Sequence, residues 1–122
     1  EIELGKDFGQ HKTVWTDKRY DANEYGTGIV NALVPDSPFS FPKSLWAVHD
    51  CLQAVIGDDP DALVLDFFAG SGTTGHAVYE LNRADQGRRR YILVQLPEPI
   101  HRGPYATIAD VTRTRLQRAG EE

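Results

Sequence analysis

One run of fourteen residues, Leu63 to His76, constrains the fold of this chain more than any other. A short apolar stretch ends in Asp66, a glycine-rich turn follows, and a helical pattern begins near Thr73. A strand, a tight turn and a helix in this order place a ligand-binding loop at the carboxyl end of a parallel strand. Glycines let the backbone approach a ligand closely, and the first N–H groups of the helix favour an anionic group. The run therefore predicts an α/β fold with a ligand site at this turn.

The acid that precedes the turn narrows the choice of ligand. Asp66 would repel a polyphosphate but suits a cationic group, whereas the helix N-terminus suits a carboxylate. S-adenosylmethionine carries both kinds of group. A P-loop is excluded because His76 stands where that motif requires lysine. The spacing Gly70-x-Gly72-x-x-Gly75 also matches a dinucleotide-binding turn. A dinucleotide-dependent oxidoreductase fragment therefore stays open, as does a non-catalytic Rossmann-like interaction module whose turn binds nothing.

The run Asp66–Thr74 resembles the cofactor motif of amino-directed DNA methyltransferases. Phe41–Ser44 resembles the segment that lies upstream of this motif in the permuted class and packs on the methionine end of the cofactor. Arg89–Glu98 resembles the second strand of the same fold, and Trp15–Tyr20 and Tyr25–Thr27 resemble the stretch before it. The flanking segments favour the methylation subunits of type III restriction–modification systems, which are adenine-N6 methyltransferases.

The resemblance implies a partial Rossmann-like, S-adenosylmethionine-dependent methyltransferase fold with a parallel sheet. Residues 1–40 would be a loop-rich segment leading into the domain, and residues 41–122 its cofactor-binding part, in a fragment of a larger chain. The parent enzyme would methylate the exocyclic N6 amine of adenine in a restriction–modification system, with cytosine N4 left open. Its partners would be double-stranded DNA, a restriction subunit and a second methylation subunit.

The predicted cofactor site draws on three segments of the chain. Asp66 is assigned to the methionine ammonium, Phe68 to the adenine or ribose, and Lys43 to the cofactor carboxylate or a DNA phosphate. Gln95 stands where the family has an acid that grips the ribose hydroxyls, and Glu98 is the other candidate. At least one of Phe67 and Phe68 is expected in the core. The full set is Phe41, Pro42, Lys43, Ser44, Asp66, Phe67, Phe68, Ala69, Gly70, Ser71, Gly72, Thr73, Thr74, Gln95 and Glu98.

No catalytic residue is predicted in this chain. Asp36-Ser37-Pro38-Phe39 resembles the second motif of amino methyltransferases, which holds the target amine and stacks on the flipped base. We reject it, because it lies two residues before Phe41 whereas the permuted class places a whole target-recognition region between the two segments. The true motif is expected before Glu1, and the chain alone is therefore expected to be inactive. That the chain does not begin with a methionine agrees with a fragment.

Composition and charge narrow the class of protein. A chain of 122 residues with 40% hydrophobic residues is one domain or part of one, and its net charge of −5 gives no global nucleic-acid signature. No apolar run of ~18 residues and no signal peptide are visible, so a cytoplasmic setting without a membrane is expected. No metal is predicted, because the histidines are scattered: His11, His49, His76 and His101.

Periodicity and punctuation predict the elements around the turn. We expect a strand near Thr13–Trp15, a helix from about Pro42 to Gly57 with Cys51 in the core, and a helix to about Asn82. Two strands, at 62–66 and Tyr91–Leu96, should form a sheet covered on both faces but with one unpaired edge. A final helix should follow a capping box at Thr107 and Asp110. Lys12, Lys18 and Arg19 form one basic cluster. Two further clusters are expected to be solvated. One is Arg88, Arg89 and Arg90, and the other is Arg113, Arg115 and Arg118.

Overall fold

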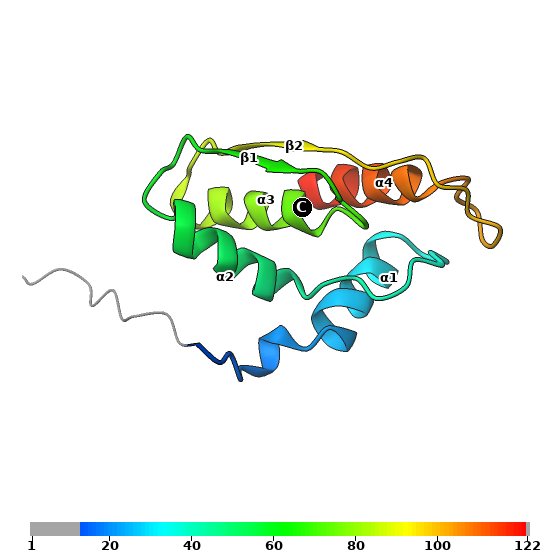
Figure 1. Cartoon of the computed structure of the whole chain (residues 1–122), viewed down its shortest axis with the longest axis horizontal. Coiled ribbons are helices and arrows are strands. Elements are labelled where there is room, and N and C mark those ends of the chain that lie inside the picture. Colours follow the sequence, from blue (N-terminus) through cyan, green and yellow to red (C-terminus); the bar gives the residue numbers. More distant parts are fainter. Residues whose placement is uncertain (1–12, 122) are drawn as a thin grey trace, which may run out of the picture.

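The computed structural model describes residues 13–121, in which a small sheet lies over a set of helices (Figure 1). Residues 1–12 and 122 lie outside the described part, and with them the expectations for His11 and Lys12. The elements in chain order are a 3-10 turn (Lys18–Tyr20), a π-helical stretch (Asn23–Gly28), α1 (Ile29–Leu33), α2 (Leu45–Ile56), β1 (Leu63–Asp66), α3 (Thr73–Asp85), β2 (Arg90–Leu93) and α4 (Ile108–Glu121).

The two strands form a parallel sheet in which Leu65 lies opposite Ile92. The chain is therefore a mixed helix and strand structure, and α3 makes the crossover between the strands. Strand β2 ends at Leu93, three residues before the predicted Leu96. Beyond it, Val94 N donates to Asp66 O and Val94 O accepts from Ala69 N, so pairing passes from the strand to the turn. Within residues 13–121 neither outer edge of this two-stranded sheet carries a further strand, so the edge of β1 is unpaired, as expected, and the edge of β2 is unpaired as well.

All the helices lie on one side of the sheet (Figure 1), whereas we expected both faces to be covered. Apart from Arg90, the side chains on the opposite face are apolar and stay between 41% and 67% exposed. Continuous apolar strands are typical of sheets buried on both faces, but the described part of this chain supplies helices to only one of them. The exposed residues are Leu63, Leu65, Phe67, Ile92, Val94 and Leu96.

The segment expected to be loop-rich contains three helical elements. Val30, Leu33 and Val34 are buried and form one core cluster with Val111 and Ala119 of α4. Residues 13–15 form a bend and an irregular stretch, so the strand expected there is wrong. The described part of the segment is thus a packed portion of the fold, because its short apolar run covers α4.

Local capping explains where the helices begin. Helix α2 begins at Leu45, not near Pro42, because Ser44 is its N-cap and its Oγ accepts from Ala47 N at 3.4 Å. The capping box before α4 is confirmed: Asp110 N donates to Thr107 Oγ1 at 3.2 Å, and Thr107 N donates to Asp110 Oδ2 at 3.0 Å. Helix α3 runs on to Asp85, past the predicted end. Cys51 is exposed, not part of the core. None of the helices between residues 13 and 121 has the length and apolar composition needed to cross a membrane.

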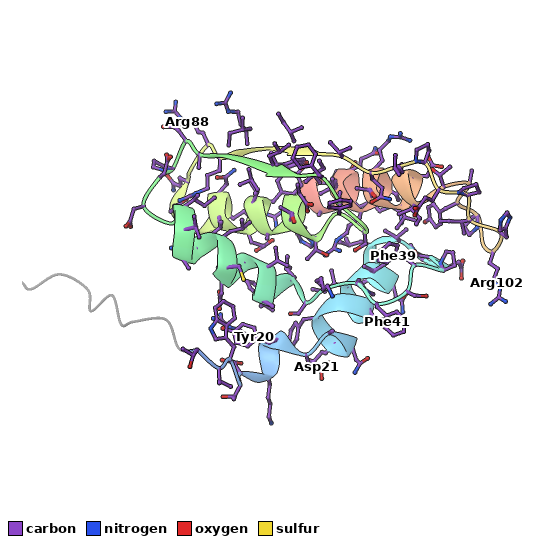
Figure 2. All side chains as sticks on the ribbon, in the orientation of Figure 1. Tyr20, Asp21, Phe39, Phe41, Arg88 and Arg102 are labelled. Carbon is purple, nitrogen blue, oxygen red and sulfur yellow. The ribbon has the colours of Figure 1, made fainter. Side chains whose placement is uncertain are left out.

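Arg89 joins three elements and is not the solvated residue that its charged neighbourhood predicts. Its side chain is fully buried and forms a two-pronged ion pair with Asp85 at 2.8–2.9 Å. It also donates to the carbonyl oxygens of Ile56 and Gly57, at the end of α2, at 3.3 and 2.8 Å. Arg88, next to it, is 83% exposed and lies at the outer end of the sheet (Figure 2), as expected.

Replacing Arg89 by methionine should destabilise the chain strongly. The change leaves two helix-terminal carbonyls without their donor, and Asp85 keeps only its hydrogen bond from Gly87 N. The loss should lower the free energy of unfolding by roughly 2–4 kcal/mol. The matched change Arg88→Met should stay within about 0.5 kcal/mol, because that side chain is in solvent. Urea unfolding followed by circular dichroism measures both, and equal effects would contradict the capping role of Arg89.

Candidate functional site

The glycine-rich turn between β1 and α3 has a backbone that requires glycine at two positions. Gly70 and Gly72 have φ of +54° and +84°. A Cβ on Gly70 would lie 3.3 Å from the Phe39 ring, and one on Gly72 would lie 3.2 Å from Thr112 Cγ2. Other residues would be strained at these angles and would also push Phe39 and α4 away.

Asp66 holds the turn at its entrance. One carboxylate oxygen accepts from Phe68 N at 2.9 Å, and the other accepts from the Thr74 hydroxyl at 2.7 Å. The side chain is half-buried, so it is neither a core group nor a free surface acid. A carboxylate offers about four acceptor positions, of which the turn uses two. Within residues 13–121 the carboxylate accepts these two hydrogen bonds and forms no ion pair.

Gln95 fixes the middle of the turn from the end of β2. Its Oε1 accepts from Gly70 N at 2.8 Å, and its Nε2 donates to Leu96 O at 3.2 Å. Both the oxygen and the nitrogen of the Gln95 side-chain amide therefore form hydrogen bonds with backbone groups. Glu98, the other residue predicted for the ribose, is exposed, and its backbone carbonyl accepts from Ile108 N at 3.0 Å.

Helix α4 supports the back of the turn through groups that sequence reasoning missed. The Thr112 hydroxyl donates to Gly70 O at 2.6 Å. Arg115, which was predicted to be solvated, is 0% exposed and donates through Nη1 to Ser71 Oγ and Thr73 Oγ1, both at 2.9 Å. The signal was in the sequence, because Arg115 interrupts the apolar stripe of the helix at a position that should face the core. Within the same cluster Arg113 is exposed as predicted.

His76 is buried beneath the turn in the first part of α3. It is 4% exposed, with Nδ1 3.4 Å from Arg115 Nη2 and Nε2 3.7 Å from the Glu80 carboxylate. Burial lowers the pKa of His76 to about 4, and the positive charges of Arg115 and Arg83 act in the same direction. The Glu80 carboxylate opposes this shift but is at the longer distance and pairs with Arg83. His76 is therefore neutral at pH 7.

The N-terminus of α3 opens on the turn without a side-chain cap. Its N-cap position is Gly72, which makes no capping hydrogen bond. The first N–H groups of a helix have no partner within the helix, and they carry the positive end of its dipole. A helix of thirteen residues therefore offers an anion-favouring end beside the Asp66 carboxylate.

Three predicted aromatic residues are exposed. Phe68 is 90% exposed and Phe67 63%, so the expectation that one of them lies in the core is wrong. Phe41 is 91% exposed and has a φ of +57°, which is unfavourable for a bulky side chain. Backbone strain of this kind often lies at functional sites.

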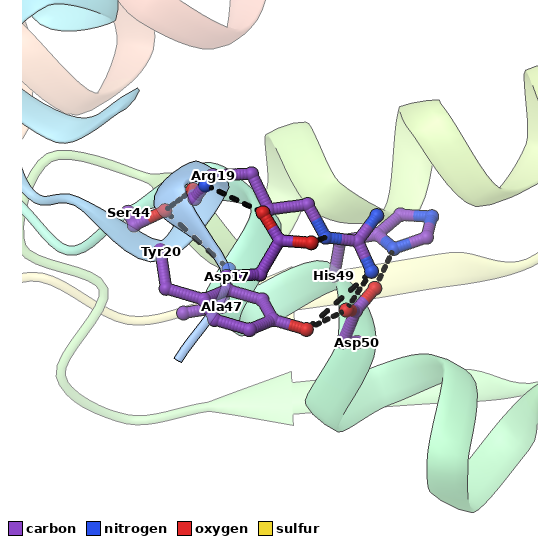
Figure 3. A network of polar contacts seen from close by, with 7 residues as sticks. All are labelled: Asp17, Arg19, Tyr20, Ser44, Ala47, His49 and Asp50. Carbon is purple, nitrogen blue, oxygen red and sulfur yellow. Dashed lines mark hydrogen bonds and ion pairs between the residues drawn. The ribbon is translucent and has the colours of Figure 1, made fainter. Parts of the chain in front are cut away.

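The segment Phe41–Ser44 is held at its far end by a polar network (Figure 3). Ser44 is buried, and its hydroxyl donates to Arg19 O at 2.8 Å. The side chains of Arg19, Tyr20 and His49 converge on the Asp50 carboxylate, with Tyr20 Oη donating to it at 2.5 Å. Pro42 is buried and Lys43 is exposed. The network therefore fixes the end of this segment and the start of α2 against the 3-10 turn at Lys18–Tyr20.

The rejected motif Asp36–Phe39 lies in the loop between α1 and α2, together with Phe41 (Figure 2). Phe39 packs against the core cluster and approaches Gly70, so it forms part of the wall of the turn. Asp36 is exposed, with a φ of +61°. No group of three or more histidine, cysteine or acidic side chains in the described part of the chain is arranged to hold a metal ion.

The chain matches one protein family and several individual proteins. The family model described as DNA methylase matches residues 4–103. The chain is 35% identical over 111 residues to the type II methyltransferase M.KpnI of Klebsiella pneumoniae, covering 86% of this chain and 26% of that protein. It is 37% identical over 112 residues to the EcoPI Mod subunit, a type III restriction–modification enzyme of Escherichia phage P1, covering 87% and 17%. The EcoP15I Mod subunit of Escherichia coli is 35% identical over 127 residues, covering 96% and 19%. The chain thus spans about a quarter or less of these relatives.

The stability of the chain should depend on pH through His76. The unfolded state binds a proton near pH 6.5 and the folded state only near pH 4, so the stabilisation is complete above about 6.5 and is lost as the pH falls towards 4. Between pH 7 and pH 5 the free energy of unfolding should fall by roughly 2 kcal/mol. Urea unfolding of His76→Gln should lack this dependence, whereas the exposed control His101→Gln should keep it. A His76→Gln variant with the original pH dependence would refute the assignment.

Proposed function

This chain belongs to the DNA methylase family, and we propose that it is the S-adenosylmethionine-binding part of an adenine-N6 DNA methyltransferase. Members of such a family need a methyl donor, and the turn between β1 and α3 has the chemistry to hold one. The proposal concerns the whole protein as well as this chain, because the chain spans only 17% to 26% of the relatives compared.

One observation carries the proposal: an acid with spare acceptor positions stands beside an uncapped helix N-terminus. Asp66 uses two of about four acceptor positions for Phe68 and Thr74, which leaves room for the methionine ammonium. The N–H groups at the start of α3 favour the methionine carboxylate. A zwitterionic amino-acid end fits this pair of opposite charges, whereas a polyphosphate would meet the Asp66 charge.

The other proposed contacts follow from which side chains are free. The exposed rings of Phe41 and Phe68 are suited to cover the adenine or the ribose. Glu98 is the better candidate for the ribose hydroxyls, because both ends of the Gln95 amide are engaged by the backbone. Lys43 is exposed and can reach the cofactor carboxylate or a DNA phosphate. Ala69, Gly70, Ser71, Gly72 and Thr73 would contact the methionine part through the backbone.

The remaining expectations concern the parent protein. We propose that the two-stranded sheet is part of a Rossmann-like methyltransferase fold, with residues 41–122 as its cofactor-binding part. The parent would act on double-stranded DNA in the cytoplasm, together with a restriction subunit and a second methylation subunit. The names of the type III relatives support this setting, whereas M.KpnI is named as a type II methyltransferase.

A dinucleotide-binding function is the alternative that the turn itself suggests. A Cβ on Gly75 would lie 2.6 Å from Leu116 Cδ2 and 3.1 Å from Leu93 Cδ1, so this glycine allows close helix and strand packing. The third glycine of the dinucleotide motif has the same role. The acid at the strand tip disfavours this alternative, because a pyrophosphate would be repelled by Asp66.

Calorimetric titration should detect binding of S-adenosylmethionine and none of NAD. The variant Asp66→Asn keeps an acceptor for Phe68 N and removes the charge that would meet the ammonium. Its affinity for S-adenosylmethionine should fall roughly tenfold or more, the usual cost of losing a charged hydrogen bond. The control Asp58→Asn, in the exposed turn before β1, should bind within about twofold of the unchanged chain.

Binding of NAD without a response to S-adenosylmethionine would remove the methyltransferase proposal. Equal affinities of Asp66→Asn and the unchanged chain would limit Asp66 to holding the turn. Glu98→Gln should weaken binding less than Asp66→Asn, because loss of the ammonium contact removes a full charge pair.

The isolated chain should bind the cofactor but transfer no methyl group to DNA. Transfer requires the target amine at close range to the sulfonium methyl group and the base out of its stack, and no residue here is assigned to either task. A labelled methyl-transfer assay on duplex DNA, with a full-length adenine methyltransferase as positive control, measures this. Robust transfer that Asp36→Ala abolishes would show that the rejected motif is catalytic.

A further inference from the structure

Arg115 is a buried cation for which residues 13–121 supply no acidic partner. Its side chain is 0% exposed, and no carboxylate oxygen of the described residues lies within ion-pair distance of it. Its Nη1 donates to two hydroxyls of the turn, Ser71 and Thr73, and its Nη2 lies 3.4 Å from His76 Nδ1. Its Nε has no hydrogen-bond partner. A charged group in this state is unusual, because buried charges are normally paired.

The groups around Arg115 do not neutralise it. Desolvation lowers the pKa of Arg115 to about 10, so the side chain is still a cation at neutral pH. His76 is neutral there, and Arg83 adds a second positive charge nearby. The nearest acid of this group, Glu80, pairs with Arg83 and faces the other side of the imidazole. Arg89, the other fully buried arginine, has Asp85 as its counter-ion, so Arg115 is the exception.

The position of Arg115 indicates where its counter-charge would lie. The guanidinium lies behind the turn, on the side of α4, and holds the two residues that flank Gly72. The positive end of the α3 dipole lies at the same place, with Gly72 as its uncapped N-cap. Two independent sources of positive potential therefore act at one short stretch of backbone. An anion bound on the open side of the turn would interact favourably with both.

We propose that Arg115 is a positioning residue for the carboxylate of the ligand bound at this turn. It fixes Ser71 and Thr73 and thereby orients the backbone N–H groups at the start of α3. The negative charge of the ligand carboxylate, on the open side of the turn, then balances the positive charge of the guanidinium behind it. This inference rests on the proposed function, since it concerns the same cofactor. A residue that only stabilised the fold would affect all ligands equally. A positioning residue for the carboxylate makes the contribution of Arg115 to binding affinity depend on the charge of the ligand.

The test compares two ligands that differ only in that charge. S-adenosylmethionine carries the carboxylate, and decarboxylated S-adenosylmethionine lacks it. Both are titrated into the full chain and into Arg115→Met, which keeps the length and bulk of the side chain without its charge. Arg115→Lys restores the charge without the planar guanidinium and its fixed donor directions. Arg113→Met is the matched control, because this arginine lies on the same helix with its side chain 74% exposed.

Arg115→Met should lose tenfold or more in affinity for S-adenosylmethionine and less than threefold for the decarboxylated ligand. Arg115→Lys should recover part of the loss, and Arg113→Met should bind both ligands normally. Without ligand, Arg115→Met should unfold at a urea concentration close to that of the unchanged chain. Ser71 Oγ and Thr73 Oγ1 are already 3.4 Å apart and can bond to each other once the guanidinium is gone. Removing a buried charge also lowers the cost of burial.

Equal losses for the two ligands would overturn the proposal and leave Arg115 as a structural clamp, while the proposed cofactor would stand. Absence of binding by the unchanged chain to either ligand would instead remove the proposed function. If Arg115→Met does not fold, Thr73→Val removes one acceptor of the guanidinium at constant shape. It should then weaken S-adenosylmethionine more than the decarboxylated ligand, and equal weakening would again refute the role of Arg115.

Discussion

The close contact between α4 and the back of the glycine-rich turn is the constraint on which the rest of this structure depends. Gly72 and Gly75 have no side chains, so Leu116 and Thr112 reach the backbone of the turn. The same helix forms the core with Val30 and Leu33 on its other side. A change of shape in the turn would therefore disturb packing that extends to the N-terminal segment. The glycine-rich turn and the core of this chain therefore form one packed unit.

The local part of this unit could be predicted from the sequence, because its determinants are neighbours along the chain. An apolar strand ending in an acid, two glycines and a pair of threonines specify the order of strand, turn and helix without help from elsewhere. The capping box at Thr107 and Asp110 is similarly local, and both features are found as expected. The resemblance added the DNA methylase family, which the comparisons show and which these local signals alone could not provide.

The parts that could not be predicted depend on partners far away in the sequence. A run of arginines looks the same in the sequence whether or not one of them, here Arg89, bonds to Asp85 and to the end of α2. The family motif predicts a ribose contact for Gln95, and no local signal predicts that its amide also accepts from a backbone N–H 25 residues earlier. Phe67 and Phe68 follow a strand pattern that normally indicates a core, and both are exposed. In each case the sequence gives the residue type, but it does not show which distant residue the side chain contacts or whether the side chain is buried.

The open face of the sheet has a consequence for how this chain behaves at high concentration. An unpaired parallel edge beside six exposed apolar side chains is a template for unwanted strand pairing between molecules. Arg90, opposite Leu63, is also exposed, and it can act as a gatekeeper against such aggregation. The net charge of −5 adds a weak mutual repulsion. Colloidal stability, more than folding stability, should therefore limit work with the chain on its own, and salt that screens this repulsion should make it worse.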